Sequence, residues 1–178
     1  MSSSVITQRG DGGETDLMFG QRVEKTHPRI VANGSLDELN ATLGLVRVFA
    51  ERYPTIAERI ATLQTQLIPI MGEIATLPED YGRYEAQFNI LDDDAVVSLT
   101  AEAKQIENAL NKKFRDWAIP GASLNTCSAY LDMARTLCRR AERDLLVLEP
   151  EECPSVIVSY LNRLSDFLWL LARKVERE

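Results

Sequence analysis

The stretch SVIVSYLNRLSDFLWLLARKV, residues 155–175, constrains the fold more than any other part of the chain. It is apolar on nearly every side of a helix, but Asn162, Arg163, Asp166 and Arg173 interrupt it. Charges inside a bilayer are costly, so these residues argue against a membrane span. A helix that is apolar almost all round, with a few polar residues along one line, is typical of the middle of a soluble helical bundle.

Apolar residues at helical spacing also recur in earlier segments. The first helix is expected to begin at Ser35, because Ser35 as N-cap and Glu38 at the third helical position form a capping box. Further helices are expected over residues 55–77, 92–114 and 126–149, and from near residue 154 to about residue 175. Residues 78–89 and 115–125 are interpreted as loops, and no persuasive strand alternation is found.

These segments predict an all-α fold, a five-helix bundle preceded by a glycine-rich N-terminal loop. We expect one domain over residues 1–178, with an N-terminal segment over residues 1–34 and the bundle over residues 35–178.

Charge and cysteine content limit the partners and the compartment. The net charge of −7 argues against nucleic-acid binding, which normally needs a basic face. Cys127, Cys138 and Cys153 form no CxxC pair and leave one cysteine over, which fits a reducing compartment. No signal peptide is visible in the first residues. We therefore expect a cytoplasmic protein with neither a nucleic-acid nor a membrane partner.

The fourth expected helix carries the strongest chemical signal. Arg135, Arg139, Glu142 and Arg143 lie on one face at spacings of three and four, with Arg140 beside them. One interpretation is a solvent-exposed helix face on which glutamate and arginine side chains form ion pairs. The other is an anion site, because arginine forks bind phosphates bidentately and stay charged at any working pH. The pattern alone leaves both interpretations open.

The segment TQRGDGGETDL, residues 7–17, has glycines whose backbone N–H groups could approach an anion closely. Arg9, Arg22 and Lys25 add positive charge nearby. However, no Gly-Lys-Ser/Thr follows the glycines, and no third glycine completes a dinucleotide fingerprint. On these residues alone, a flexible tail is the better interpretation.

Metal and nucleophile sites find little support. The only histidine, His27, stands just before Pro28, so paired Glu-x-x-His motifs and most catalytic triads are excluded. No cysteine has a histidine beside it in sequence. We expect no metal ligands from the protein, and His27 is interpreted as a surface loop residue.

Taken together, TQRGDGGET, GQRVEKTHPRIVANGSLDELNATLGLVR, IPGAS, ARTLCRRAER and YLNRLSDFLWLLAR resemble the propanediol-utilisation type of ATP:cob(I)alamin adenosyltransferases, or corrinoid adenosyltransferases. The resemblance covers nearly the whole chain except residues 78–115. It implies a five-helix bundle that assembles as a homotrimer, with active sites between adjacent subunits. It also implies transfer of the 5′-deoxyadenosyl group of ATP to the cobalt of cob(I)alamin, which gives adenosylcobalamin and triphosphate. Mg²⁺ would arrive with ATP, and a reductase or a cobalamin-dependent acceptor enzyme would be a further partner.

The resemblance implies an ATP site made from the N-terminal loop of one subunit and two helices of its neighbour. The implied ATP-binding residues are Thr7, Gln8, Arg9, Gly10, Thr15, Asp16, Lys25, Arg139, Arg140, Glu142, Arg143 and Asn162.

The corrinoid side of the site is implied by four residues. Asp37 and Arg135 match an acid–arginine pair that bridges subunits in the family, and with Arg139 they are the implied catalytic residues. Trp117 and Phe167 are the implied aromatic contacts to the corrin. Trp117 could equally be an ordinary core or interface aromatic.

Two positions depart from the family pattern. Gln8 replaces a common lysine, and Asp16 adds a negative charge near the expected phosphates. These departures motivate an alternative function, a non-catalytic helical bundle that binds or delivers corrinoid or nucleotide. In either case the loop is expected to be mobile without ATP and ordered with it.

Overall fold

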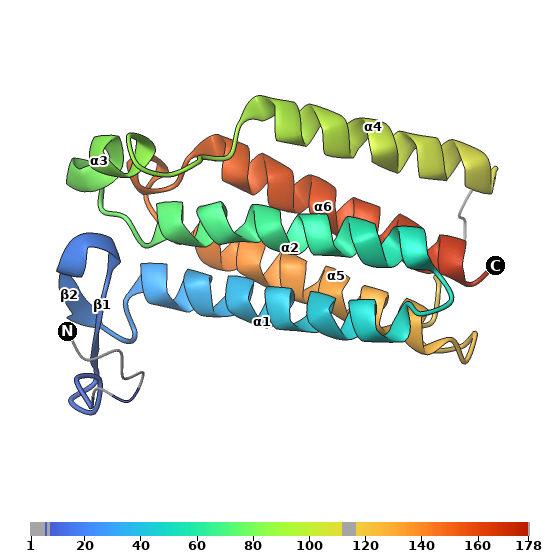
Figure 1. The fold of residues 1–178 in the computed structure, drawn as a ribbon, viewed down its shortest axis with the longest axis horizontal. Helices are drawn as coiled ribbons and strands as arrows, with labels where there is room; N and C mark the ends of the chain where they lie inside the picture. The colour runs from blue at the N-terminus through green and yellow to red at the C-terminus, as the bar shows by residue number, and fades with distance from the viewer. Residues whose placement is uncertain (1–5, 7, 112–116, 178) are drawn as a thin grey trace.

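The computed structural model describes residue 6, residues 8–111 and residues 117–177. Within these residues, five long helices lie alongside one another in a bundle (Figure 1). They are α1 (Pro28–Phe49), α2 (Pro54–Ile74), α4 (Asp93–Leu110), α5 (Thr126–Leu145) and α6 (Ser155–Val175). The predicted all-α bundle is confirmed.

Short elements occupy the connections between these helices. They are the strands β1 (Glu14–Asp16) and β2 (Arg22–Glu24), the helix α3 (Tyr81–Glu85), and the 3-10 turns η1 (Met18–Gly20), η2 (Pro78–Asp80) and η3 (Pro150–Glu152). Residues 78–89 therefore contain η2 and α3, which corrects the expectation of a plain loop there.

Helix α6 lies in the middle of the packing, as its sequence predicts. It packs against both α4 and α5, while α1 packs against α2 and α5. Tyr160, Leu164 and Leu168 repeat every four residues along α6, and all three are fully buried.

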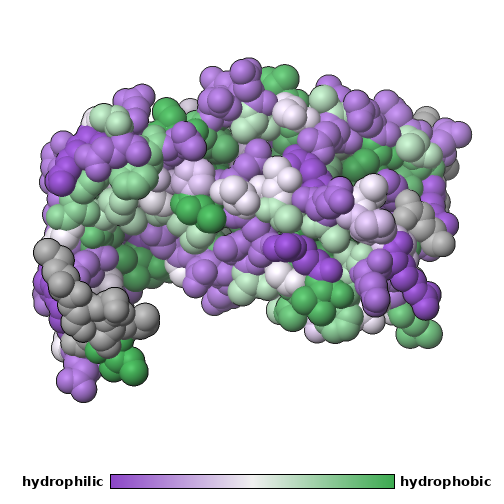
Figure 2. Space-filling model, in the orientation of Figure 1, coloured by the Kyte–Doolittle hydropathy of each residue, from purple (hydrophilic) through white to green (hydrophobic). Residues whose placement is uncertain are grey.

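None of the helices described is long and apolar enough to cross a membrane. The face of the molecule shown in Figure 2 is mostly hydrophilic, with separate hydrophobic patches.

The start of α1 differs from the expectation. The helix begins at Pro28, with His27 as N-cap, and the Nδ1 atom of His27 accepts a hydrogen bond from the Arg29 N–H group at 3.2 Å. Proline suits the first helical position because its φ angle is already helical and its missing N–H is not needed there. Ser35 is buried inside the helix and donates its hydroxyl to Asp144 of α5. The expected boundary at residue 35 is therefore wrong, and His27 is a half-buried helix cap instead of a free loop residue.

An antiparallel ribbon, absent from the sequence-based expectation, precedes α1. Strands β1 and β2 pair with Thr15 opposite Val23 and Asp16 opposite Arg22. Each strand has three residues, too few to show alternation in a sequence. The ribbon lies beside the N-terminal end of α1 (Figure 1), so it orders part of the glycine-rich segment outside the core.

Candidate functional site

The glycine-rich loop is closed by its own backbone and by Lys25. The N–H group of Gly13 donates to the Gly10 carbonyl at 3.2 Å, and that of Lys25 donates to the Gly13 carbonyl at 2.8 Å. The Nζ atom of Lys25 lies 3.1 Å from the position that a Cβ atom on residue 10 would take. Because residue 10 is a glycine and has no Cβ atom, the Lys25 ammonium group can lie close to its backbone. The predicted site residues Gly10 and Lys25 are neighbours, whereas Thr7 lies outside the described residues.

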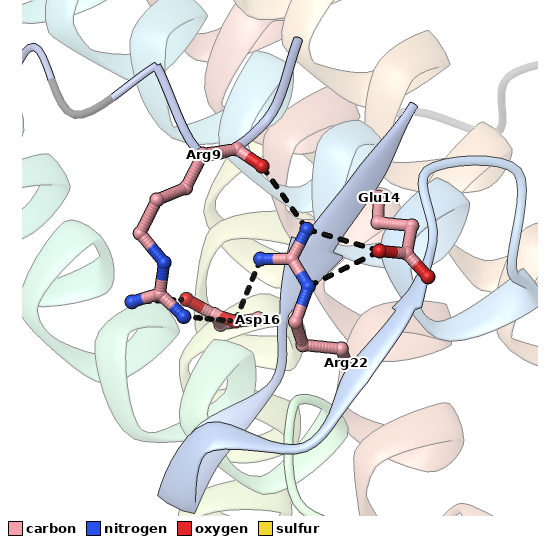
Figure 3. A network of polar contacts seen from close by, with 4 residues as sticks. All are labelled: Arg9, Glu14, Asp16 and Arg22. Atoms are coloured by element: carbon pink, nitrogen blue, oxygen red, sulfur yellow. Dashed lines mark hydrogen bonds and ion pairs between the residues drawn. The ribbon is translucent and has the colours of Figure 1, made fainter. Parts of the chain in front are cut away.

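Four charged side chains form a network across the ribbon (Figure 3). Arg22 contacts Glu14 at 3.2 Å and Asp16 at 3.1 Å, and it donates to the Arg9 carbonyl oxygen at 3.0 Å. Arg9 pairs with the other oxygen of Asp16 at 3.2 Å. The hydrogen bond to Glu14 raises the pKa of Arg22, so its charge is fixed at any working pH. The negative charge of Asp16, a departure from the family pattern, is therefore balanced by two guanidinium groups.

A groove of about 370 Å³ lies between α4, α5 and α6. Arg135 and Arg139 of α5 line it, together with Lys104 of α4 and Arg163 of α6. Glu107 and Asp166 are the acidic residues in the lining, which otherwise consists of Thr100, Ala103, Ser165, Trp169 and Leu170. Cations from three helices thus border one open space that could hold an anion.

The remaining candidates on α5 and α6 have partners of their own. Asn162 donates its side-chain amide to Glu142 at 3.0 Å, and Arg143 donates to the Arg139 carbonyl at 3.0 Å. Arg140 instead forms an ion pair with Glu38 of α1. The arginines of α5 therefore do not all point the same way: Arg140 is directed towards α1, whereas Arg135 and Arg139 line the groove.

Among the described residues, no hydrogen bond or ion pair joins the charged network of the ribbon to the arginines of α5. The described contacts of residues 8–25 stay within that segment or run to His27, Ala75, Asp80 and Arg83.

The residues assigned to the corrinoid lie in different environments. Trp117 is 98% exposed, whereas Phe167 is 1% exposed and lies in the core, with the Arg59 guanidinium 5.6 Å from its ring centroid. The burial of Phe167 within this chain gives no support to its assignment as a corrin contact, which stays a prediction. Asp37 is exposed, and Arg135 approaches Asp132 of its own helix at 4.0 Å instead of Asp37.

Sequence reasoning missed two cations of the groove and one buried ion pair. Arg163 stands within the YLNRLSD motif, a signal that could have identified it, whereas Lys104 belongs to the segment outside the resemblance. The buried pair joins Asp132 of α5 to Arg173 of α6 at 2.6 Å.

The three cysteines are buried. Burial raises the pKa of Cys127 and that of Cys153 to about 11, and burial also raises the pKa of Cys138. These thiols are therefore poor sources of thiolate. Among residues 6, 8–111 and 117–177, no three His, Cys, Asp or Glu side chains gather closely enough to hold a metal ion.

The fold is a helical bundle, and arginine and lysine side chains border its open groove. Such cations suit a phosphate-bearing ligand. The sequence model of the family described as "Cobalamin adenosyltransferase" matches residues 5–175. The chain belongs to the cobalamin adenosyltransferase family.

Known proteins are similar to this chain along almost its whole length. Corrinoid adenosyltransferase PduO from Citrobacter freundii is 37% identical over 178 residues, which are 98% of this chain and 50% of that protein. A corrinoid adenosyltransferase from Bacillus subtilis is 35% identical over 177 residues, 96% of this chain and 86% of that protein. This chain thus spans about half the length of its PduO relative. A solved variant of the PduO-type ATP:corrinoid adenosyltransferase from Lactobacillus reuteri, complexed with cobalamin and ATP, has a TM-score of 0.87 at 27% identity. That match covers 98% of this chain and 91% of the solved one.

Proposed function

We propose that this chain transfers the 5′-deoxyadenosyl group of ATP to the cobalt of cob(I)alamin. The electron pair of Co(I) forms the cobalt–carbon bond to C5′, and the C5′–oxygen bond breaks with its electron pair going to triphosphate. The nucleophile is thus a substrate, which agrees with the buried cysteine thiols and the helix-capping role of His27. The protein must align the two substrates and stabilise the charge on the departing triphosphate.

The observation that carries this proposal is the groove bordered by Arg135 and Arg139, in a chain that belongs to this family. Guanidinium groups stabilise phosphate oxygens through paired N–H donors. We assign triphosphate binding to Arg139 and Arg143, with Arg140 and with the Glu142–Asn162 pair at the border of the site. Mg²⁺ enters with the ATP substrate.

The N-terminal loop is the second half of the proposed ATP site. Gln8, Arg9, Gly10, Thr15, Asp16 and Lys25 are assigned to nucleotide contact, and Thr7 joins them from the resemblance alone. The ammonium group of Lys25 beside Gly10 supports this assignment, because it places a cation within the glycine-rich loop, where it could pair with a phosphate.

A small substitution tests this loop directly. Gly10→Ala is expected to displace the Lys25 ammonium and to raise KM for ATP about threefold, the effect of losing one modest polar contact. Gly12→Ala is the matched control, because a Cβ atom there meets nothing within 4 Å. Equal KM values for the two variants would argue against a phosphate contact by Lys25.

We propose a homotrimer in which the loop of one subunit meets the α5 arginines of the next. Asp37 and Arg135 would pair across that interface, since Asp37 is exposed and Arg135 has only a distant partner in its own helix. Exposed apolar side chains on α1 and α5, among them Val48 and Met133, support self-association.

Light scattering after gel filtration should give three times the chain mass of 20.0 kDa. Asp37→Arg should shift the protein towards the monomer, because two cations would then meet at the interface. A trimer unchanged by Asp37→Arg would contradict this pairing.

The activity itself is tested by mixing the protein with ATP, Mg²⁺ and chemically reduced cob(I)alamin without oxygen. We expect adenosylcobalamin and triphosphate in equal amounts. Binding of both substrates without adenosylcobalamin would instead support the non-catalytic alternative.

A further inference from the structure

The turn between β1 and β2 holds an aromatic residue in an unfavourable backbone conformation. Phe19 has φ 68° and ψ 8°, in the left-handed region that bulky residues seldom adopt. Gly20, with φ 92°, follows it without such a cost. Strain of this kind persists only where the surroundings fix the conformation. The contacts around Phe19 therefore need an explanation.

These contacts come from the end of α2 and from α3. The Arg83 guanidinium carbon lies 4.0 Å from the centroid of the Phe19 ring, a close cation–π contact. The Met18 N–H group donates to the Ala75 carbonyl at 2.8 Å, and the Gln21 amide donates to the Asp80 carboxylate. The turn is thus attached to the bundle on both sides of Phe19.

Helix α3 is in turn fixed to α2 by buried groups. Glu73 of α2 accepts hydrogen bonds from the Tyr81 hydroxyl at 2.7 Å and from the Leu91 N–H group at 2.8 Å. The Tyr84 hydroxyl donates to the Pro69 carbonyl at 3.0 Å.

The tyrosine of α3 also needs a glycine on α2. A Cβ atom on Gly72 would lie only 2.2 Å from the Tyr84 hydroxyl oxygen, so the glycine is required for this approach. Because Glu73 and the Tyr84 hydroxyl are buried and hydrogen-bonded, Asp80 of η2 and Arg83 of α3 are held in a defined place.

We infer that η2 and α3, residues 78–85, form a clamp that positions the nucleotide loop, with Arg83 as the positioning residue. This inference rests on the proposed function, since it assigns the loop's ligand as the ATP phosphates. The physical connection runs from α3 to Phe19, along the paired strands, and through the Lys25 N–H bond to Gly13. Residues 78–85 thus act on the site without touching the substrate.

The test compares Arg83→Gln and Arg83→Lys with the unchanged trimeric protein. In the absence of ligand, Arg83→Gln should speed hydrogen exchange of the amides in residues 14–24 about fivefold, as expected for loss of one cation–π contact. It should also raise KM for ATP about fivefold, while kcat and KM for cob(I)alamin change less than about twofold. Arg83→Lys should recover most of both effects, because an ammonium group can also lie over the ring.

The matched control is Glu85→Gln, an exposed charge on the same helix; within the described residues its side chain makes no hydrogen bond or ion pair and acts on Glu73 and Tyr81 through its charge alone. It should leave hydrogen exchange and KM for ATP unchanged. Unchanged exchange in Arg83→Gln would overturn the clamp even if the enzyme is active. An equal change in kcat and both KM values would also overturn it, because that result indicates general damage. Absence of activity in the unchanged protein would instead overturn the proposed function, while the exchange measurement would still test the clamp.

Discussion

Arg139→Ala is expected to lower kcat/KM for adenosylation about 100- to 1,000-fold while the helical fold survives. This is the range seen when one preorganised donor to a developing negative charge is removed. Arg139 lines the groove next to Arg135, and its side chain is exposed, so its removal leaves the core packing intact. Stability should therefore change by less than about 0.5 kcal/mol.

Thr136→Ala provides the control on the same helix, because Thr136 is exposed and its hydroxyl only donates to the Met133 carbonyl. Initial rates of cobalt–carbon bond formation, with circular dichroism for helix content, measure both variants. Normal kinetics in Arg139→Ala would mean that the triphosphate lies elsewhere.

The long helices could be predicted because local signals agree with their packing. For α5, Asn125 caps the helix by accepting from the Ser128 N–H group at 3.1 Å, and the apolar stripe that follows is buried. At α1 two local signals compete. Ser35 and Glu38 resemble a capping box, but Pro28 already starts a helix, and Ser35 serves better as a partner of Asp144. Only the packing of α1 on α5 decides between them.

The candidate site was predictable where it depends on one helix and not where it depends on several. Spacing places Arg135 and Arg139 together on α5, and the structure does bring both to the groove. Lys104 and Arg163 join them from other helices, which spacing along one helix cannot reveal. The pairing of Asp16 with Arg9 and Arg22 similarly depends on a strand register that three-residue strands do not encode in their pattern.

The buried ion pair between Asp132 and Arg173 lies in contact with residues of the proposed site. Asp132 and Arg173 are 3% and 5% exposed in their side chains, and their closest atoms are 2.6 Å apart. Asp132 also lies 4.0 Å from Arg135, while the Arg173 guanidinium lies 5.6 Å from the ring centroid of Trp169, another groove residue. The carboxylate of Asp132 is therefore shared between a structural arginine and a proposed site arginine.

Asp132→Ala should lower the free energy of unfolding by about 3 kcal/mol, because it leaves the Arg173 charge buried with Glu176 as its remaining carboxylate partner. The double variant Asp132→Leu, Arg173→Met should recover most of that loss, since apolar side chains of similar size carry no desolvation cost. Asp166→Ala, which removes the exposed partner of Arg163, should cost less than about 1 kcal/mol. Urea unfolding followed by circular dichroism measures all three variants. If the double variant were as unstable as Asp132→Ala, the loss would come from packing and not from an uncompensated charge. If it were stable but inactive, the ion pair would be retained for its effect on Arg135.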